Sequence, residues 1–489
     1  MESNRNFSKL SEHRLNKKKG IVKTPLNDAL GDLLTLTSWQ DNRMPEYLWL
    51  GLILNSFERK TGIEKVMAIL SEISGSIDFL THPKFSEILF LSVKNQEIIY
   101  KIILKYIDAK IIAPLTLLYR NVEYPTFNKF FYLSELTFEY RFEALSHSIK
   151  VFSPGQSNEA TDLRYLSLCL QIFNKQIHVQ DSSFLALKEY PNTDHDDQKM
   201  HMFRPLVRSM EGVGIALAKS NEEFNRKFWR DIGMISGCQA MHLKFTPNSD
   251  GYESFIDNSK ELLEYITLIN KENSLSDDRF DVFLGSVTYC LKIVNEIAEK
   301  KLGDCILARH GVRTILEIYI ILKYLIKKEN ENPRIWEEYK LYGISKYKLI
   351  LLKAREGIVE NESHFSPDIV KALVNEIKWE EFINIDLKYF DKLGIREKSI
   401  EVDEKFLYDL LYDYDSNFSH GLWGAIRESS MLICDNHNHK FHSVPDFNFN
   451  QNLPDVKFDL LMVAKKVLFL LSENYSTPES YTHFILHSK

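Results

Sequence analysis

Two stretches in the C-terminal half of the chain place cations, carboxylates, hydroxyls and imidazoles at the spacing of a helical turn. In the first, Arg309, Arg313 and Glu317 stand at every fourth position and share one stripe of a helix. Residues 315–326 are apolar on nearly every side, which predicts a central place in a bundle. Ionised groups on such a helix must be paired or face a cleft. We expect either an Arg313–Glu317 pair that leaves Arg309 for an anionic ligand or another carboxylate, or an ion pair that reaches solvent.

The second stretch carries Tyr412, Ser416 and His420, again four residues apart, on a helix predicted over about 403–431. His420 is the strongest candidate for a general acid or base, because histidine titrates near neutral pH without help from its surroundings. Trp423 lies between two glycines, which permit close approach of a helix or a ligand. No nucleophile-elbow motif surrounds Ser416. The alternative is a histidine that is hydrogen-bonded at a contact between helices.

Cysteine and histidine side chains, which are common zinc ligands, gather directly after this helix. Cys434, His437, His439 and His442 occur within nine residues. Four ligands so close in sequence strain a tetrahedral site, and their spacing is not that of a known structural zinc motif. The sequence therefore predicts a polar loop that packs His439 and His442 against the arginine-bearing helix, without a metal or other cofactor. A metal site formed by Cys434, His439 and His442 is the alternative.

Composition limits both the fold and the function. Of the 489 residues, 44% are hydrophobic and 12% aromatic, enough to bury more than one core, so general disorder is excluded. The 19 glycines and 14 prolines are few for this length, which favours long helices over a turn-rich sheet protein. The formal net charge of −7 gives no basic field for nucleic acid, so contact with RNA would require a local patch.

The cellular compartment is predicted from cysteine usage and hydropathy. Five scattered cysteines indicate no disulfide framework, and the polar N-terminus is not a signal peptide. No apolar run reaches the roughly 18 residues that a membrane-spanning helix needs. We therefore expect a cytoplasmic protein without membrane contact. RNA, a protein partner and a second copy of the chain stay open as partners.

Periodicity and turn residues predict an all-α architecture in two helical parts. Residues 1–28 read as a basic flexible tail, 29–250 as a multi-helix N-terminal domain, and 251–489 as a C-terminal helical bundle that carries the polar site. The boundary lies within the turn-rich run FTPNSDGY at 245–252. The arginine-bearing helix is expected over about 304–328.

Several separated motifs of the C-terminal half are similar to those of one family. They are an Arg-x3-Arg-x3-Glu helix, a Ser-x3-His-Gly step, a Trp-Gly pair and a Cys-x4-His-x2-His-x2-Pro tail, formed by Arg309, Arg313, Glu317, Ser416, His420, Gly421, Trp423, Gly424, Cys434, His439, His442 and Pro445. Over roughly residues 275–475 the chain resembles the bacterial domain-of-unknown-function family 5677. The resemblance implies a helical bundle and brings no established reaction.

A looser resemblance is to HEPN-type helical bundles, whose ribonuclease members carry an Arg-x4–6-His motif for metal-independent cleavage. No arginine stands in that interval before His420, so Arg309 or Arg313 would act from a neighbouring helix. The resemblance implies a ribonuclease-like, phosphoester-cleaving effector in which His420 moves the proton and the arginines stabilise phosphate charge. The alternative is a non-enzymatic sensor or scaffold whose polar pocket binds a ligand or a protein partner. The expected catalytic group is Arg309, Arg313, Glu317, Ser416 and His420, and the expected binding group is Tyr412, Trp423, His439 and His442.

Overall fold

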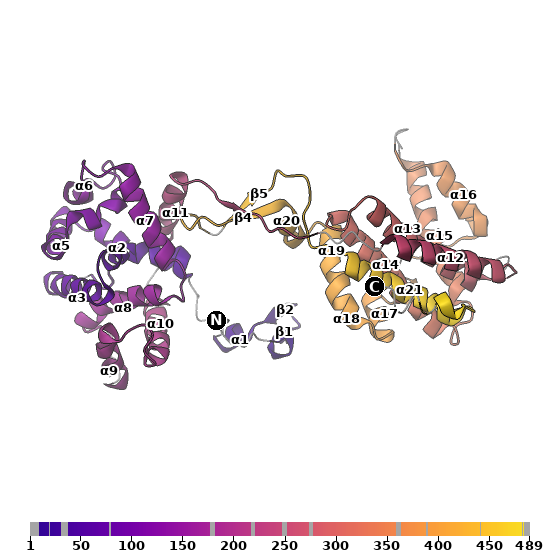
Figure 1. Cartoon of the computed structure of the whole chain (residues 1–489), viewed down its shortest axis with the longest axis horizontal. Coiled ribbons are helices and arrows are strands. Elements are labelled where there is room, and N and C mark those ends of the chain that lie inside the picture. Colours follow the sequence, from indigo (N-terminus) through magenta and orange to yellow (C-terminus); the bar gives the residue numbers. More distant parts are fainter. Residues whose placement is uncertain are drawn as a thin grey trace. The chain divides into compact units, whose positions relative to one another are not determined.

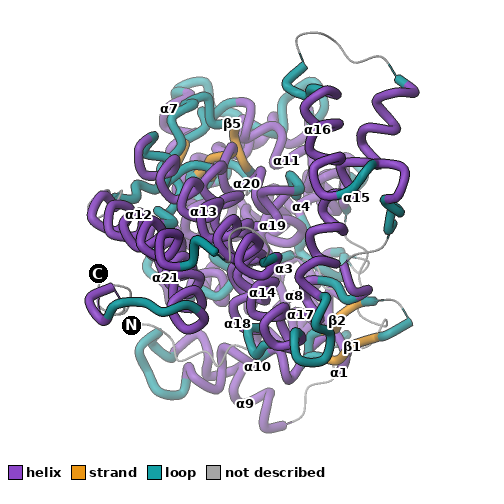
Figure 2. The backbone as a smooth tube through the Cα atoms, turned by 90° about the vertical axis from the view of Figure 1, so that its right-hand side faces the viewer, coloured by secondary structure: helices purple, strands orange, loops and turns teal. Residues whose placement is uncertain are grey.

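The computed structural model describes residues 9–18, 20–30, 38–77, 80–176, 181–216, 221–246, 252–272, 277–357, 363–387, 390–440, 442–481 and 483. In that part of the chain helices predominate and strands occupy only short stretches (Figure 1; Figure 2). The all-α prediction is confirmed. None of the described helices is long and apolar enough to cross a membrane.

The chain divides into two compact units. Unit 1 comprises Met1–Ala240 together with Cys434–His442, and unit 2 comprises Met241–Ile433 together with Ser443–Lys489. The chain therefore passes from one unit to the other three times. The boundary expected at residue 250 lies outside the described residues. The short return of the chain into unit 1 was not predicted from the sequence.

The described residues at the N-terminus form short, mostly exposed elements. Strand β1 (Arg14–Asn16) pairs antiparallel with β2 (Ile21–Lys23), and helix α1 (Pro25–Leu30) follows. Gly20, with a φ of +62°, lies in the connecting turn, where a residue without a side chain adopts this backbone conformation without strain. The sequence predicted a basic flexible tail for this region and none of these elements.

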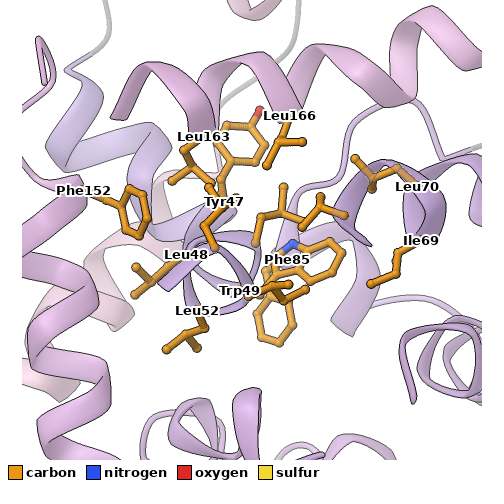
Figure 3. Packing of buried hydrophobic residues seen from close by; sticks show 14 of the residues in the cluster. Tyr47, Leu48, Trp49, Leu52, Ile69, Leu70, Phe85, Phe152, Leu163 and Leu166 are labelled. Carbon is orange, nitrogen blue, oxygen red and sulfur yellow. The ribbon is translucent and has the colours of Figure 1, made fainter. Parts of the chain in front are cut away.

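Unit 1 is built around α2, a helix that is buried along almost its whole length. The helices of this unit are α2 (Met44–Asn55), α3 (Arg59–Ser76), α4 (Phe85–Leu89), α5 (Val93–Tyr106), α6 (Pro125–Phe131), α7 (Phe138–Phe152), α8 (Asn158–Phe173), α9 (Asp181–Glu189), α10 (Met200–Ala216) and α11 (Glu222–Met234). Because α2 is enclosed on all sides, it has no polar stripe. Its residues Tyr47, Leu48, Trp49 and Leu52 pack among side chains of the surrounding helices (Figure 3).

Unit 2 has α14 at its centre. Its helices are α12 (Tyr252–Ile269), α13 (Asp278–Glu299), α14 (Ile306–Lys328), α15 (Ile335–Glu356), α16 (Pro367–Ile377), α17 (Ile395–Glu401), α18 (Lys405–Leu407), α19 (Asp413–Ser419), α20 (Trp423–Ser430) and α21 (Lys457–Asn474). Helix α14 packs against α13, α17, α19 and α21. Its apolar residues are buried, as the sequence predicted for the helix over about 304–328.

The single helix predicted over 403–431 is wrong, because the structure interrupts it twice. A π-helical turn, η10 (Tyr408–Tyr412), separates α18 from α19. Helix α19 then ends in a Schellman motif: Gly421, directly after the C-cap residue, has a φ of +59°, and the amide of Leu422 donates to the carbonyl of Asn417 at 2.9 Å. A left-handed glycine reverses the chain direction, so α20 is a separate helix.

A short hairpin follows α20. Strand β4 (Met431–Cys434) pairs antiparallel with β5 (Ser443–Pro445), with Leu432 opposite Val444. A two-residue strand, β3 (Ala240–Met241), lies earlier in the chain, where unit 1 gives way to unit 2. The segment between β4 and β5 carries the cysteine and histidines noted in the sequence.

Candidate functional site

Arg313 is the centre of a hydrogen-bonded network between α14 and the turn that leads into α19. Its Nε donates to Ser416 Oγ at 3.1 Å and its Nη2 donates to Tyr412 Oη at 2.6 Å. Its Nη1 lies 3.4 Å from Glu317 Oε2, and Tyr412 donates to the same oxygen at 3.1 Å. The structure thus brings together four of the residues that the sequence analysis selected, and they hydrogen-bond to one another.

The electrostatics of this network favour a neutral tyrosine. Burial and the Glu317 carboxylate raise the pKa of Tyr412, while Arg313, whose guanidinium carbon lies 4.6 Å from the ring centroid, opposes the shift. The Arg313 and Glu317 side chains each keep 23% of their surface exposed. The network is therefore a half-buried ion pair with a hydroxyl on each side.

Arg309 lies inside the protein and holds two segments of unit 2 together. It is 2% exposed. Its Nη1 donates to the carbonyls of Cys305 at 3.0 Å and Gly303 at 3.3 Å, and its Nη2 donates to that of Pro454. These bonds join the start of α14 to the segment before α21. Because the guanidinium is enclosed by carbonyls and the ring of Phe418, it does not present its charge at the surface.

Asp415 of α19 is a buried carboxylate in the electrostatic field of Arg309. Burial raises its pKa to about 7, with smaller contributions in the same direction from Asp459 and Glu428, while Arg309 lowers it. The hydrogen bonds of Arg309 go to backbone carbonyls, and Asp415 interacts with it through its charge. The sequence analysis did not select Asp415, since one acidic residue on a helix carries no signal of burial.

His420 and Trp423 lie on the surface at the break between α19 and α20. His420 is the C-cap residue of α19, and its backbone amide donates to Ser416 O at 3.0 Å. Within the described residues its imidazole has no hydrogen-bond partner. Trp423 begins α20 and is 65% exposed. Neither side chain takes part in the Arg313 network.

A pocket of about 540 Å³ lies beside this network, between α14, α15, the end of α16, and α17. Glu317 forms part of its wall, so the pocket and the network share one carboxylate. Tyr339 and Tyr342 of α15 line it together with Phe390, whose ring centroid lies 5.4 Å from that of Tyr339. The remaining lining residues are Ile321, Lys340, Gly343, Ile344, Tyr347, Ile377 and Lys398. The wall is thus mainly aromatic and aliphatic.

Lys398 is the most deeply buried charged group of this pocket. It is fully buried, and its Nζ donates to the carbonyls of Phe390 and Leu393, both at 2.8 Å. Burial lowers the pKa of Lys398 to about 8. The lysine therefore fixes the segment before α17 against α14, where its ammonium also lies 4.6 Å from the ring centroid of Tyr324.

A second constellation lies in unit 1, where Cys238 joins Cys434, His439 and His442. One donor atom from each side chain lies within 4.8 Å of all the others. Nδ1 of His439 is 3.4 Å from Cys434 Sγ, 3.6 Å from Cys238 Sγ and 3.0 Å from Nε2 of His442. Cys238 Sγ is 3.7 Å from Nε2 of His442. The four side chains therefore bring their donor atoms close enough together to bind one metal ion.

Residues 280–439 match the model of a family of unknown function, DUF5677. The family expected from the sequence motifs is therefore confirmed for this part of the chain. No curated protein and no solved structure matches the chain.

The DUF5677 region contains the whole Arg313 network and most of the pocket wall. It also contains Cys434 and His439, whereas Cys238 and His442 lie outside the matched residues. The sequence analysis expected His439 and His442 to pack against the arginine-bearing helix. In the structure the two histidines belong to unit 1, and that helix belongs to unit 2.

Cys238 is the functional candidate that sequence reasoning missed. It lies 201 residues before His439, so no local spacing connects the two. His437, in contrast, lies in the same loop as the other ligands but is exposed and takes no part in the cluster. The only signal in the sequence was the concentration of one cysteine and three histidines at 434–442, which fits a metal site once a further cysteine is supplied from elsewhere.

Proposed function

We propose that unit 2 is a ligand-binding module and that the protein acts as a non-enzymatic sensor or scaffold. The observation that carries this proposal is that Glu317 belongs both to the pocket and to the Arg313 network. Its side chain lines the pocket of about 540 Å³ and accepts the hydrogen bond of Tyr412 in the Arg313 network. A molecule in the pocket therefore contacts a residue on which the pairing of α14 with η10 depends.

The lining of the pocket favours a small, largely apolar ligand that contains a ring. Its volume falls within the range of about 300–1,000 Å³ that is usual for small-molecule sites. The rings of Tyr339, Tyr342 and Phe390 supply faces and edges for aromatic contacts. Glu317 adds a carboxylate, which can orient a polar substituent of the ligand.

The position of Glu317 also suggests how binding is communicated. Tyr412 ends a π-helical turn, and such turns are frequent at functional sites. Its ring stacks on Tyr408 with a centroid distance of 4.7 Å. A ligand that redirects Glu317 removes an acceptor from Tyr412 and so changes the free energy of this turn. The proposal thus places the sensing contact at Glu317 and the response at η10 and α19.

The ribonuclease-like function expected from the sequence receives less support from the same geometry. Arg309 is enclosed by backbone carbonyls, and Arg313 is paired with Glu317. His420 is exposed and makes no hydrogen bond to either arginine within the described residues. Phosphate-stabilising arginines must reach the substrate together with the histidine. For this reason we favour binding over cleavage.

Filling the pocket with a side chain tests the proposal. Gly343 lines the pocket, and a Cβ at this position meets no heavy atom within 4 Å. Gly343→Trp should occupy the pocket without disturbing α15, since glycine is in any case a poor helix former. Gly285→Trp is the matched control, because Gly285 is an exposed glycine of α13 with equally open space and lies outside the pocket.

The probe is the fluorescent dye anilinonaphthalene sulfonate, added to the full chain. We expect saturable binding to the wild type and to Gly285→Trp, and an affinity at least about tenfold weaker for Gly343→Trp, equivalent to about 1.4 kcal/mol. Equal binding by all three proteins would contradict the proposal. A melting temperature measured for each variant shows that the fold is retained.

A further inference from the structure

We infer that Cys238, Cys434, His439 and His442 form a structural zinc site in unit 1, independent of the ligand pocket proposed for unit 2. Two thiols and two imidazoles are a ligand set that structural zinc sites use. All four residues belong to unit 1, although Cys238 precedes His439 by 201 residues in the sequence.

The distances between the donor atoms fit a tetrahedron around zinc. With Zn–S near 2.3 Å and Zn–N near 2.0 Å, the edges of a tetrahedron are roughly 3.6 Å between sulfur and nitrogen and roughly 3.3 Å between two nitrogens. The sulfur–nitrogen distances of 3.4, 3.6 and 3.7 Å and the nitrogen–nitrogen distance of 3.0 Å lie close to these values. The remaining distances between the donor atoms are at most 4.8 Å.

Ser236 orients His439 for this role. Its hydroxyl donates to the carbonyl of Ile232 at 2.9 Å, so toward His439 Nε2, also 2.9 Å away, it is an acceptor. The carbonyl of Ser236 lies 3.3 Å from the same nitrogen and can only accept. Nε2 must therefore carry the ring proton, which leaves the lone pair of Nδ1 directed at the two sulfurs. A hydrogen bond to the second ring nitrogen is the usual support of a metal-bound histidine.

The remaining contacts of the loop hold its backbone in place around the four ligands. The amide of Asp435 donates to Gln239 O at 2.8 Å, and Asn436 Nδ2 donates to Gly237 O at 2.5 Å. Both bonds connect the loop to the residues that flank Cys238. Asn438 Nδ2 donates to Ser146 Oγ of α7 at 2.7 Å. The loop is thus fixed to unit 1 on both sides of the proposed ion.

The site has a structural rather than a catalytic character. Four protein ligands complete the coordination of zinc and leave no position for water or substrate. Cys434 and His439 are buried, which shields the thiolate from solvent and from oxidation. Two thiolates balance the charge of the dication, so the ion can be held without a further carboxylate.

The chain passes between the two units at three places, and a zinc ion bound by these four residues would anchor the chain to unit 1 next to each of them. Cys238 lies just before the first crossing, Cys434 directly after the second, and His442 directly before the third. The segment 434–442 is too short to bury a core of its own, and none of its described residues joins the main core of unit 1. Metal ligation therefore adds to the hydrogen bonds that attach the segment to unit 1. Loss of the metal should weaken this attachment.

The test is metal analysis of the full chain, produced without a metal-binding tag. We expect about one zinc ion per chain in the wild type and its loss in Cys434→Ser and His439→Ala. His437→Ala is the matched control, since His437 is a histidine of the same loop outside the cluster, and it should retain the metal. Wild-type protein without bound metal, or equal metal loss in the control, would overturn the inference.

A second measurement remains decisive if the variants fail to fold. Chelator-treated wild-type protein is titrated with cobalt(II), which gives intense visible bands only in a tetrahedral site with thiolate ligands. Appearance of these bands, followed by their loss when zinc is added, supports the site. Their absence, or mass spectrometry showing a disulfide between Cys238 and Cys434 in freshly purified protein, would overturn it. Addition of the chelator should also lower the melting temperature of the wild type.

Discussion

The hydroxyl of Ser236 lies 2.9 Å from Nε2 of His439, while Nδ1 of the same ring lies 3.4 Å from Cys434 Sγ. The imidazole therefore connects a hydrogen-bond acceptor just after α11 to the sulfur of Cys434, which is far away in the sequence. Its two nitrogens have different roles, and Ser236 assigns them. Removing the hydroxyl should weaken metal binding without removing a ligand.

Ser236→Ala should accordingly lower the affinity for zinc by about 10- to 100-fold, while saturating zinc still gives one ion per chain. Competition with a chromogenic chelator measures the affinity. Ser76→Ala, an exposed serine that bonds only to its own helix, serves as the control and should bind zinc like the wild type. An unchanged affinity in Ser236→Ala would mean that the hydroxyl does not set the tautomer.

Arg309→Met should destabilise unit 2 by about 2–4 kcal/mol, because it removes the buried guanidinium that donates to the carbonyls of Gly303, Cys305 and Pro454. Urea unfolding followed by circular dichroism measures the loss. Arg313→Met is the matched comparison and should cost only about 1 kcal/mol, since the Arg313 side chain is partly exposed and its partners can bind water. A larger loss for Arg313 would reverse the roles assigned to the two arginines.

Asp415→Asn should change how stability depends on pH. The pKa of Asp415 is about 7 in the folded state, above the ordinary value near 4 of an unfolded chain. The folded protein thus binds the proton more tightly, so this contribution to stability is complete below about pH 4 and is lost as pH rises through about 7. The variant cannot ionise at this position and should lose less stability than the wild type as pH rises from about 4 to about 7. Unfolding measured at several pH values tests this, with Asp413→Asn on the exposed face of α19 as the control.

Gly51→Ala should destabilise unit 1 by about 1–3 kcal/mol, because the new methyl group would lie 2.7 Å from the ring of Phe152. Gly75→Ala is the counterpart: Gly75 is a helical glycine of α3 with no heavy atom near the new Cβ, and this change should stabilise by about 0.5–1 kcal/mol. Thermal unfolding of the two variants should therefore shift in opposite directions. Two shifts of the same sign would contradict the packing described for α2.

His420→Ala distinguishes the proposed binding function from the ribonuclease-like one. We expect the purified wild type to leave RNA intact, and we expect the variant to melt at the wild-type temperature because the side chain is exposed. Electrophoresis of a labelled single-stranded RNA after incubation with each protein measures cleavage. Cleavage by the wild type that disappears in His420→Ala would favour the ribonuclease and count against our proposal.

Local periodicity was sufficient for the parts of the fold and site that lie on single helices. Arg313 and Glu317 were expected to pair because they stand one turn apart on an apolar helix, and the structure has that pair. The same reasoning failed between 403 and 431, where hydrophobic spacing continues across a π-helical turn and a left-handed glycine. The spacing of apolar residues indicates which face of a helix is buried. It indicates neither a π-helical turn nor the positive φ of Gly421.

Only the tertiary structure decided the relationships between residues far apart in the sequence. Arg309 and Arg313 look equivalent in the sequence. In the structure the first donates to the backbone carbonyl of Pro454, and the second donates to the hydroxyl of Tyr412. Cys238 is one of five scattered cysteines until the fold brings it to Cys434, His439 and His442. The sequence by itself determined the all-α class, the central helix over about 304–328 and the residue types that could bind a metal or a ligand. Whether these residues come together in one site depends on how the buried faces of the helices pack. Packing involves the whole chain, so it cannot be predicted from the spacing of neighbouring residues.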